Sequence, residues 1–237
     1  MAVTVDSEMA SNVAANVAGA TSLTYSFTNT AGTYLVVAAE INGIPQTVSL
    51  SSVTYNAVTV NKYAATEVGW DPADVNSRCR MAVYTLQSPA TGANNVVVTG
   101  SVSDNLLSAA ISLTGAKASA AEANGTSNFA STAVTTSPTI TLSSVAASSL
   151  CLVSYAHGGA IQAGLSFSPA QTQSAFKDVD TSSAGNNLTM TRFTGSGTLT
   201  PTATCTAADQ WGVSAMEILA AVSAQFPFDQ RPNLVRF

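Results

Sequence analysis

Side chains able to act as acids, bases or nucleophiles are few and widely spaced in this sequence. His157 is the single histidine among 237 residues. The run His157-Gly158-Gly159 is similar to the oxyanion loop of esterases, but no G-x-S-x-G nucleophile elbow accompanies it. No motif places a serine or an aspartate beside His157 to complete a triad. We therefore interpret His157 as a loop residue at the end of a strand, and we expect no catalytic residue and no enzyme activity.

The cysteines do not form a metal or disulfide pattern. Cys79, Cys151 and Cys205 lack the paired spacing of a structural zinc site. An odd number of widely spaced cysteines is not a disulfide framework. We expect buried free thiols, because a free cysteine behaves as a small apolar residue.

Two short acidic clusters have the composition of calcium ligands. Asp71 and Asp74 form one, and Asp178 and Asp180 form the other, both in predicted loops. Calcium takes carboxylate and carbonyl oxygens in loops, but neither cluster fits an EF-hand. We interpret both as solvated acidic loops, and we expect no metal and no cofactor.

Carboxylates and tryptophans bear on sugar chemistry. Glu40 and Glu217 sit in apolar runs. A buried acid needs a partner, so we expect both residues at exposed strand edges. No sequence feature pairs them as the two carboxylates of a glycosidase. Trp211 adjoins an apolar run and is expected in the core. Trp70 precedes an Asp-Pro pair, and we interpret it as a loop tip and a candidate surface contact.

Composition excludes several classes of protein. Charged residues make up 9% of the chain and hydrophobic residues 46%, whereas a typical domain is about 25% charged. Eight basic residues and a net charge of −5 provide no basic face for nucleic acid. The longest apolar run, residues 34–39, is far below the roughly 20 residues of a membrane span. The N-terminus has no signal-peptide pattern, so we expect synthesis and retention in a cytoplasm.

Alternating apolar and polar residues, separated by turn signals, predict an all-β chain. Residues 34–41 are almost continuously apolar and predict a central strand, and Asn56-Ala57 predicts a tight turn. Asp104-Asn105 is interpreted as the turn of a hairpin, and residues 117–136 as a long crossover between sheets. The fold expected is an antiparallel β-sandwich, jelly-roll-like, with about 10–12 strands in one domain over residues 1–222. The expected strands are residues 23–27, 34–41, 48–55, 58–63, 81–86, 96–102, 107–113, 139–145, 150–155, 188–193, 200–206 and 211–219.

The last fifteen residues have a different character. Residues 223–237 contain two prolines, which exclude a regular helix or a central strand. Such an apolar segment either folds back on its own sandwich or docks on a neighbouring chain, and we favour an extended, partner-binding arm. Its candidate partner-binding residues are Phe226, Phe228, Arg231, Leu234, Val235, Arg236 and Phe237.

The order of the β runs resembles a known module. The residues that carry the resemblance are the runs 21–27, 32–39, 52–60, 82–86, 89–99 and 109–116. They are similar to the β-sandwich module found in tailed-phage virion proteins and bacterial surface proteins, where glycine is frequent at the positions of Asn56 and Ala57. The resemblance covers roughly residues 3–221 and supplies no catalytic residue. It implies a structural or adhesive role.

Two functions follow from the resemblance. The first is a structural virion protein of a tailed bacteriophage, in particular a capsid decoration (cement) protein that bridges neighbouring subunits of the shell. Its expected partners are the major capsid protein or another virion protein and further copies of itself, a trimer being one option, and its place is the virion, assembled in the host cytoplasm. The alternative is a glycan-binding or adhesion module of a tail fibre or bacterial cell surface.

Overall fold

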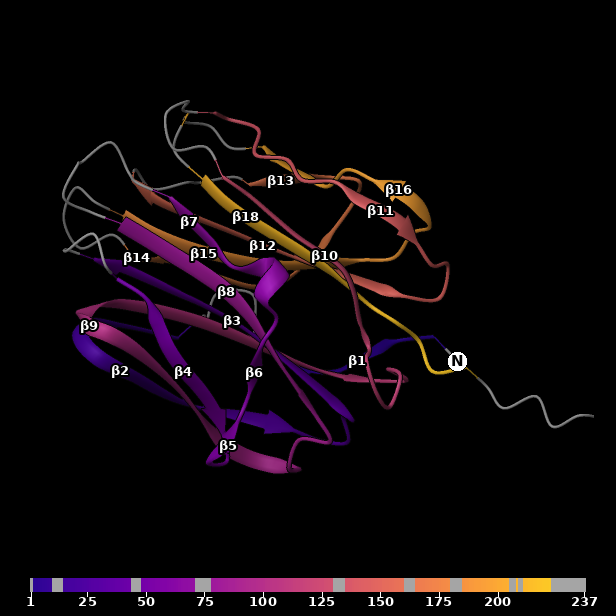
Figure 1. The fold of residues 1–237 in the computed structure, drawn as a ribbon, viewed down its shortest axis with the longest axis horizontal. Coiled ribbons are helices and arrows are strands. Elements are labelled where there is room, and N and C mark those ends of the chain that lie inside the picture. The colour runs from indigo at the N-terminus through magenta and orange to yellow at the C-terminus, as the bar shows by residue number, and fades with distance from the viewer. Residues whose placement is uncertain are drawn as a thin grey trace, which may run out of the picture.

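The computed structural model describes residues 2–9, 15–43, 48–70, 78–129, 135–159, 165–179, 185–204, 208 and 211–222 (Figure 1). These residues form antiparallel β-strands and one short 3-10 helix, η1 (Ala64–Thr66), with no α-helix among them. Twelve of the eighteen described strands have four residues or more, and the others have two or three. The predicted all-β, antiparallel sandwich is therefore confirmed. None of the described helices could cross a membrane.

The first sheet contains nine strands and nearly closes on itself. Its main order is β5-β4-β9-β3-β8-β6, with β1 and β2 paired to β9 and β7 paired to β8. Two short strands one residue apart make the closure, since Thr59 pairs with Thr54 of β4 and Asn61 pairs with Thr85 of β8. The strands are β1 (Thr4–Glu8), β2 (Ala15–Asn29), β3 (Tyr34–Gly43), β4 (Leu50–Tyr55), β5 (Val58–Thr59), β6 (Asn61–Lys62), β7 (Val68–Trp70), β8 (Arg78–Gln87) and β9 (Gly92–Thr114).

Strand β9 is continuous for 23 residues, so the hairpin predicted at Asp104-Asn105 is wrong. Its first part pairs with β4 as far as Gly100, and its last part pairs with β3 from Asn105 onward. Strand β2 follows β9 through both parts, with register shifts around Ala20. Because β-bulges bend a strand without reversing it, the chain changes neighbours here instead of turning back.

The second sheet has five strands in the order β10-β18-β12-β15-β14. Its strands are β10 (Glu122–Phe129), β12 (Leu150–Gly159), β14 (Thr172–Val179), β15 (Gly185–Phe193) and β18 (Trp211–Ile218). The predicted crossover over residues 117–136 does lead from the first sheet to the second, but it contains β10. Two small sheets, β11 (Leu142–Val145) with β16 (Gly197–Leu199) and β13 (Ser166–Ser168) with β17 (Thr202–Thr204), complete the described fold.

Three apolar clusters separate these layers. Alternate residues of β3 point in opposite directions: Leu35 and Val37 lie in the cluster enclosed by the curved first sheet, and Val36 lies in the cluster between the two large sheets. The third cluster fills the other face of the second sheet, which the small sheets cover (Figure 1). The predicted central position of residues 34–41 is confirmed, because β3 lies between β8 and β9.

Candidate functional site

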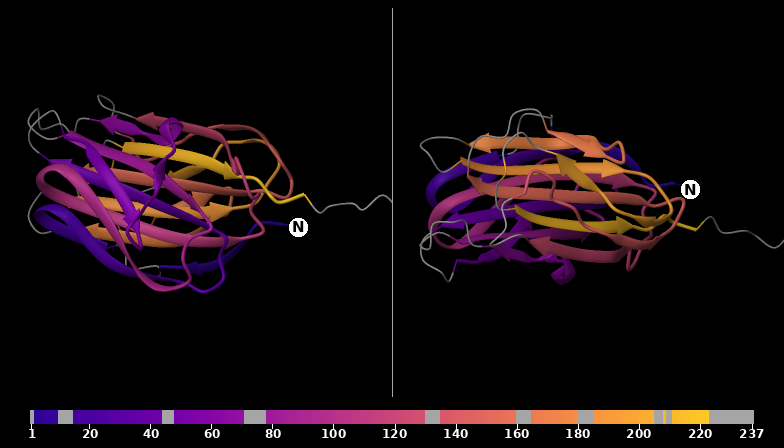
Figure 2. Two further views of the ribbon diagram at one scale, coloured as in Figure 1. Left: turned by 60° about the horizontal axis from the view of Figure 1, so that its bottom comes forward. Right: turned by 90° about the horizontal axis from the view of Figure 1, so that it is seen from above.

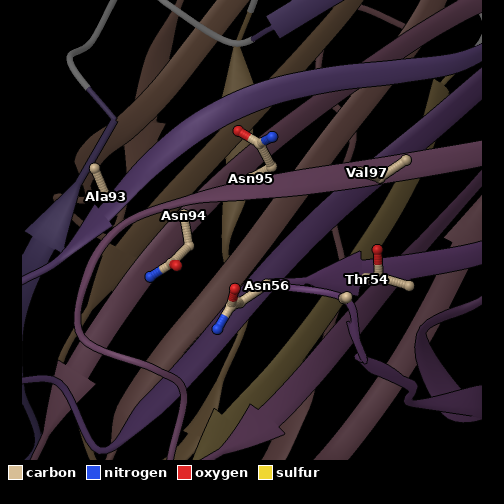
Figure 3. Close-up of a pocket in the computed structure, with 7 residues that line it drawn as sticks. Thr54, Asn56, Ala93, Asn94, Asn95 and Val97 are labelled. Atoms are coloured by element: carbon tan, nitrogen blue, oxygen red, sulfur yellow. The ribbon is translucent and has the colours of Figure 1, made fainter.

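An open hollow of about 470 Å³ lies on the outer face of the first sheet, where the turn after β4 meets the start of β9 (Figure 3). The buried neighbours Val53, Tyr55, Val96 and Val98 face the opposite way, into the core. Alternation along the strands therefore places polar residues outward. The hollow is lined by Thr54, Asn56, Ala57, Ala93, Asn94, Asn95 and Val97.

The floor of the hollow depends on a strained turn. Asn56 and Ala57 both have positive φ, 49° and 61°, and they connect Tyr55 to its cross-strand partner Val58. Two left-handed residues in a two-residue loop define a type I′ hairpin, as the predicted tight turn requires. The backbone N–H of Asn56 donates to the carbonyl of Asn95 over 3.0 Å, which fixes the turn against β9.

Asn94 is held by its own loop and by a buried tyrosine. Its Nδ2 lies 3.0 Å from the carbonyl oxygen of Thr91 and 3.3 Å from Tyr55 Oη. The Tyr55 hydroxyl in turn lies 3.1 Å from the carbonyl oxygen of Ala90. Figure 3 shows the Asn94 and Asn56 side chains reaching into the same space, whereas Asn95 points the other way.

The chemistry of this hollow is that of neutral hydrogen bonding. Residues 48–61 and 88–103, which surround it, contain no Asp, Glu, Lys, Arg or His. Amide and hydroxyl groups can both donate and accept hydrogen bonds, so the site suits an uncharged polar ligand. It has no acid, base or nucleophile pair with which to catalyse a reaction. The sequence contained two signals for it, the Asn56-Ala57 turn and the Asn94-Asn95 run just before the expected strand 96–102.

A carboxylate joins the two large sheets away from the hollow. Glu122 of β10 accepts hydrogen bonds from the hydroxyl of Tyr34 on β3 and, over 2.6 Å, from that of Thr85 on β8. Burial alone would raise the pKa of Glu122, but these hydrogen bonds lower it below its ordinary value. Burial and the neighbouring carboxylate raise the pKa of Tyr34. Because these hydrogen bonds hold β10 against β3 and β8, we interpret Glu122 as a structural contact between the two sheets.

Glu40 and Glu217 are buried on interior strands, so the expectation of exposed strand edges is wrong. Glu217 is 1% exposed and accepts hydrogen bonds from the Asn124 amide and from the backbone N–H of Ala146. Glu40 is fully buried, and neither of its oxygens has a hydrogen-bond partner within the described ranges. Burial raises the pKa of Glu40 well above its ordinary value. The two acids occupy different core clusters by strand alternation, so they form no catalytic pair.

The other predicted residues do not gather into a site. His157 lies inside β12, paired with Asn187 on one side and Trp211 on the other, so its interpretation as a loop residue is wrong. Trp211 is fully buried, as predicted. Trp70 ends β7 opposite Cys79, and its side chain is outside the description.

Of the remaining predicted residues, two cysteines can be placed and most of the others lie outside the described part of the chain. Cys79 and Cys151 are both fully buried, as expected, and burial raises the pKa of the Cys151 thiol to about 12. The residues Cys205, Asp71, Asp74 and Asp180, and the arm residues Phe226, Phe228, Arg231, Leu234, Val235, Arg236 and Phe237, lie outside the described residues. Within the described part, no group of three His, Cys, Asp or Glu side chains could hold a metal ion. Comparisons with protein-family models, curated proteins and solved structures find no match for this chain.

Proposed function

We propose that this chain is a non-enzymatic structural protein of a tailed-phage virion, a capsid decoration protein that binds neighbouring subunits. The observation that carries the proposal is that the first and the last described residues of the chain lie side by side. A Cβ on Gly115 would lie 2.3 Å from the carbonyl oxygen of Ala2, and the N–H of Ala221 donates to the Gly115 carbonyl over 2.8 Å. Figures 1 and 2 show the N-terminal mark and the end of β18 at the same end of the molecule.

This end of the sandwich is suited to carry an attachment segment. Val222, the last described residue, is 89% exposed and is one of two large apolar side chains exposed within the described ranges. The sequence continues from it into residues 223–237, with three phenylalanines, one leucine and one valine. Burying each large apolar side chain against a partner would contribute roughly 1.5–3 kcal/mol before the cost of ordering the segment. Arg231 and Arg236 add charges that fit an acidic partner surface.

The body of the molecule supports the same role. Three buried apolar clusters stack through its layers, and close-packed cores of this kind resist deformation. A stiff body held at an attachment end can reinforce a shell, because force applied at the attachment is transmitted through it. The resemblance to virion and surface modules supplies the phage assembly as the setting.

Deletion of residues 223–237 tests the proposal. Purified particles from the source would be stripped of this chain and then mixed with the full chain or with the shortened one, and bound copies would be counted by mass spectrometry. We expect the full chain to bind in many copies and the shortened chain to stay unbound, with unchanged circular dichroism. A matched control replaces Arg231 and Arg236 by lysine, which keeps both charges. Full binding by the shortened chain would contradict the proposed attachment.

The neutral hollow favours a second candidate function, a glycan-binding module. Sugars are uncharged polyhydroxyl ligands, and the hollow offers amide and hydroxyl groups without charge. A glycan array would test this, with Asn94→Ala expected to abolish any binding. Trp70→Ala checks whether the tryptophan contributes, and Asn61→Ala, an exposed asparagine outside the lining, serves as the control. Absence of binding to every glycan would remove this candidate.

A further inference from the structure

Strand β2 forms an open margin of the first sheet. It pairs only with β9 among the described strands, from Ala15 to Asn29. Between Ser22 and Asn29 the register with β9 is regular. Outside that ladder, no backbone–backbone hydrogen bond joins residues 21–28 to another described residue. Figure 2 (left) shows β2, in indigo, along the lower margin of the molecule.

The side chains of this margin leave its backbone accessible. Ser22, Thr24, Ser26 and Thr28 are exposed and point away from the core. Leu23 and Phe27 point inward and are 5% and 4% exposed. Tyr25, at the centre, is half-buried, and its hydroxyl lies 2.9 Å from Ser108 Oγ. An edge strand of this kind presents unpaired N–H and C=O groups to a further strand.

The features by which proteins block edge pairing are missing from this stretch. Natural edges carry lysine, proline, bulges or a covering segment, or they are very short. Residues 20–30 contain no charged residue and no proline. The register shifts of β2 are confined to residues before Ser22.

Three other sheet margins in the described part have features that hinder pairing. On β10, Ser127 donates to the carbonyl of Glu67, and a Cβ on Gly125 would meet the ring of Tyr63, so the segment around η1 covers this margin. Strand β14 has a register shift between Gln173 and Ala175. At the closure of the first sheet, β5 and β6 have two residues each. Strand β2 is therefore better prepared for pairing than these three margins.

We propose that two copies of this chain associate by antiparallel pairing of β2 with β2 across a two-fold axis at Tyr25. This interface deepens the proposed structural role, on which it rests, and uses residues other than 223–237. Pairing about Tyr25 places Thr24 opposite Ser26 of the second copy and Leu23 opposite Phe27. Each exposed hydroxyl side chain then faces another, Thr24 against Ser26 and Ser22 against Thr28, and such cross-strand hydroxyl pairs are favourable.

A second copy is the occupant that fits this stretch. An antiparallel strand paired with its own copy keeps its inward residues inward, so both cores stay intact. The uncharged sequence creates no repulsion between the copies, and a two-fold axis gives a closed dimer. The pairing joins the β4-β9-β2 region of both copies into one continuous sheet.

Charge placement tests the register. We would prepare the full chain with Thr24→Lys and Ser26→Lys, and separately with Thr24→Asp and Ser26→Asp, and measure association by sedimentation equilibrium. Each variant alone puts two like-charge pairs directly opposite one another, and the dimer dissociation constant should rise about tenfold or more. A one-to-one mixture pairs lysine with aspartate and should recover dimerisation. Ser52→Lys with Thr54→Lys, on the same face but in the interior strand β4, should leave the wild-type constant unchanged.

Hydrogen exchange locates the interface. Amides of residues 21–28 should exchange more slowly in the wild-type dimer than in the lysine variant. A wild-type chain that stays monomeric, a lysine variant that dimerises as well as wild type, or a mixture that fails to recover would each overturn the interface. Particle binding is measured in parallel. A monomeric lysine variant that still binds particles would leave the attachment through residues 223–237 standing. A wild-type dimer that never binds particles would contradict the virion role but not the interface.

Discussion

Glu8 and Arg192 form a two-point ion pair that joins the two large sheets. Glu8 Oε2 lies 3.0 Å from Arg192 Nε, and Glu8 Oε1 lies 3.1 Å from Arg192 Nη2. Glu8 belongs to β1 of the first sheet and Arg192 to β15 of the second. Burial alone would raise the pKa of Glu8, but the hydrogen bonds and charge of Arg192 lower it.

Neutralising this pair should weaken the sandwich slightly. We expect Glu8→Gln to cost up to about 1 kcal/mol in free energy of unfolding, because both side chains are partly exposed to solvent. The lowered pKa means that this contribution is present above the unfolded pKa and is lost as pH falls through the folded value. Urea denaturation between pH 3 and 7 measures it. Glu67→Gln, which breaks the more exposed and local pair with Lys62, should cost less, and an equal cost would contradict the role in joining the sheets.

Ala57 is the position at which a substitution should stabilise the fold. Its φ of 61° is left-handed, which costs a residue with a Cβ about 1–2 kcal/mol. Because glycine removes that strain but is more flexible when unfolded, Ala57→Gly should raise the free energy of unfolding by roughly 0.5–1 kcal/mol. Thermal and urea denaturation measure the gain. Ala93→Gly, on the same hollow but without positive φ, should instead destabilise, and a gain there would show that strain is not the cause.

The sequence predicted the features that depend on neighbouring residues. The apolar run of residues 34–41 indicated burial on both faces, and β3 is buried on both faces. Asn56-Ala57 indicated a tight turn, and both residues have the required positive φ. Asp104-Asn105 has the composition of a turn, but pairing of β2 along both parts of β9 keeps the chain extended there.

The candidate site could not be predicted in the same way. Asn56 meets Asn94 and Asn95 only because β4 pairs with β9, which joins residues about 40 positions apart. Glu40 is buried because a second sheet covers that face of β3. The apolar run around Glu40 does not show by itself which face of the strand will be covered. Long-range pairing, rather than residue type, decides both features.

Asn29 should be among the least replaceable polar residues. It is fully buried, its Nδ2 donates to the carbonyls of Gly32, Pro89 and Ala90, and its Oδ1 accepts from the N–H of Gly32. Asn29→Ala removes these bonds and takes the side-chain donor from the buried carbonyls of Gly32 and Pro89, so we expect a loss of about 2–4 kcal/mol by urea denaturation. Asn29→Asp keeps the shape but points an acceptor at three carbonyls, and it should be at least as harmful. A tolerated aspartate would show that shape alone is required.

Glu40 should make the stability of this protein fall as pH rises. Its folded pKa is raised above the ordinary value of 4.5 by burial, so the folded state holds a proton that the unfolded state releases. Its contribution is therefore complete below about pH 4.5 and is lost as pH rises toward the folded pKa, at up to about 1.4 kcal/mol per pH unit. Glu40→Gln cannot ionise and should remove this slope, so that the variant gains on wild type between pH 5 and 8 in urea denaturation. Glu217→Gln, which takes a hydrogen-bonded acid from the interior strand β18, is the control and should leave the slope in place. If wild type and Glu40→Gln show the same pH dependence, the Glu40 carboxyl does not stay protonated in the core.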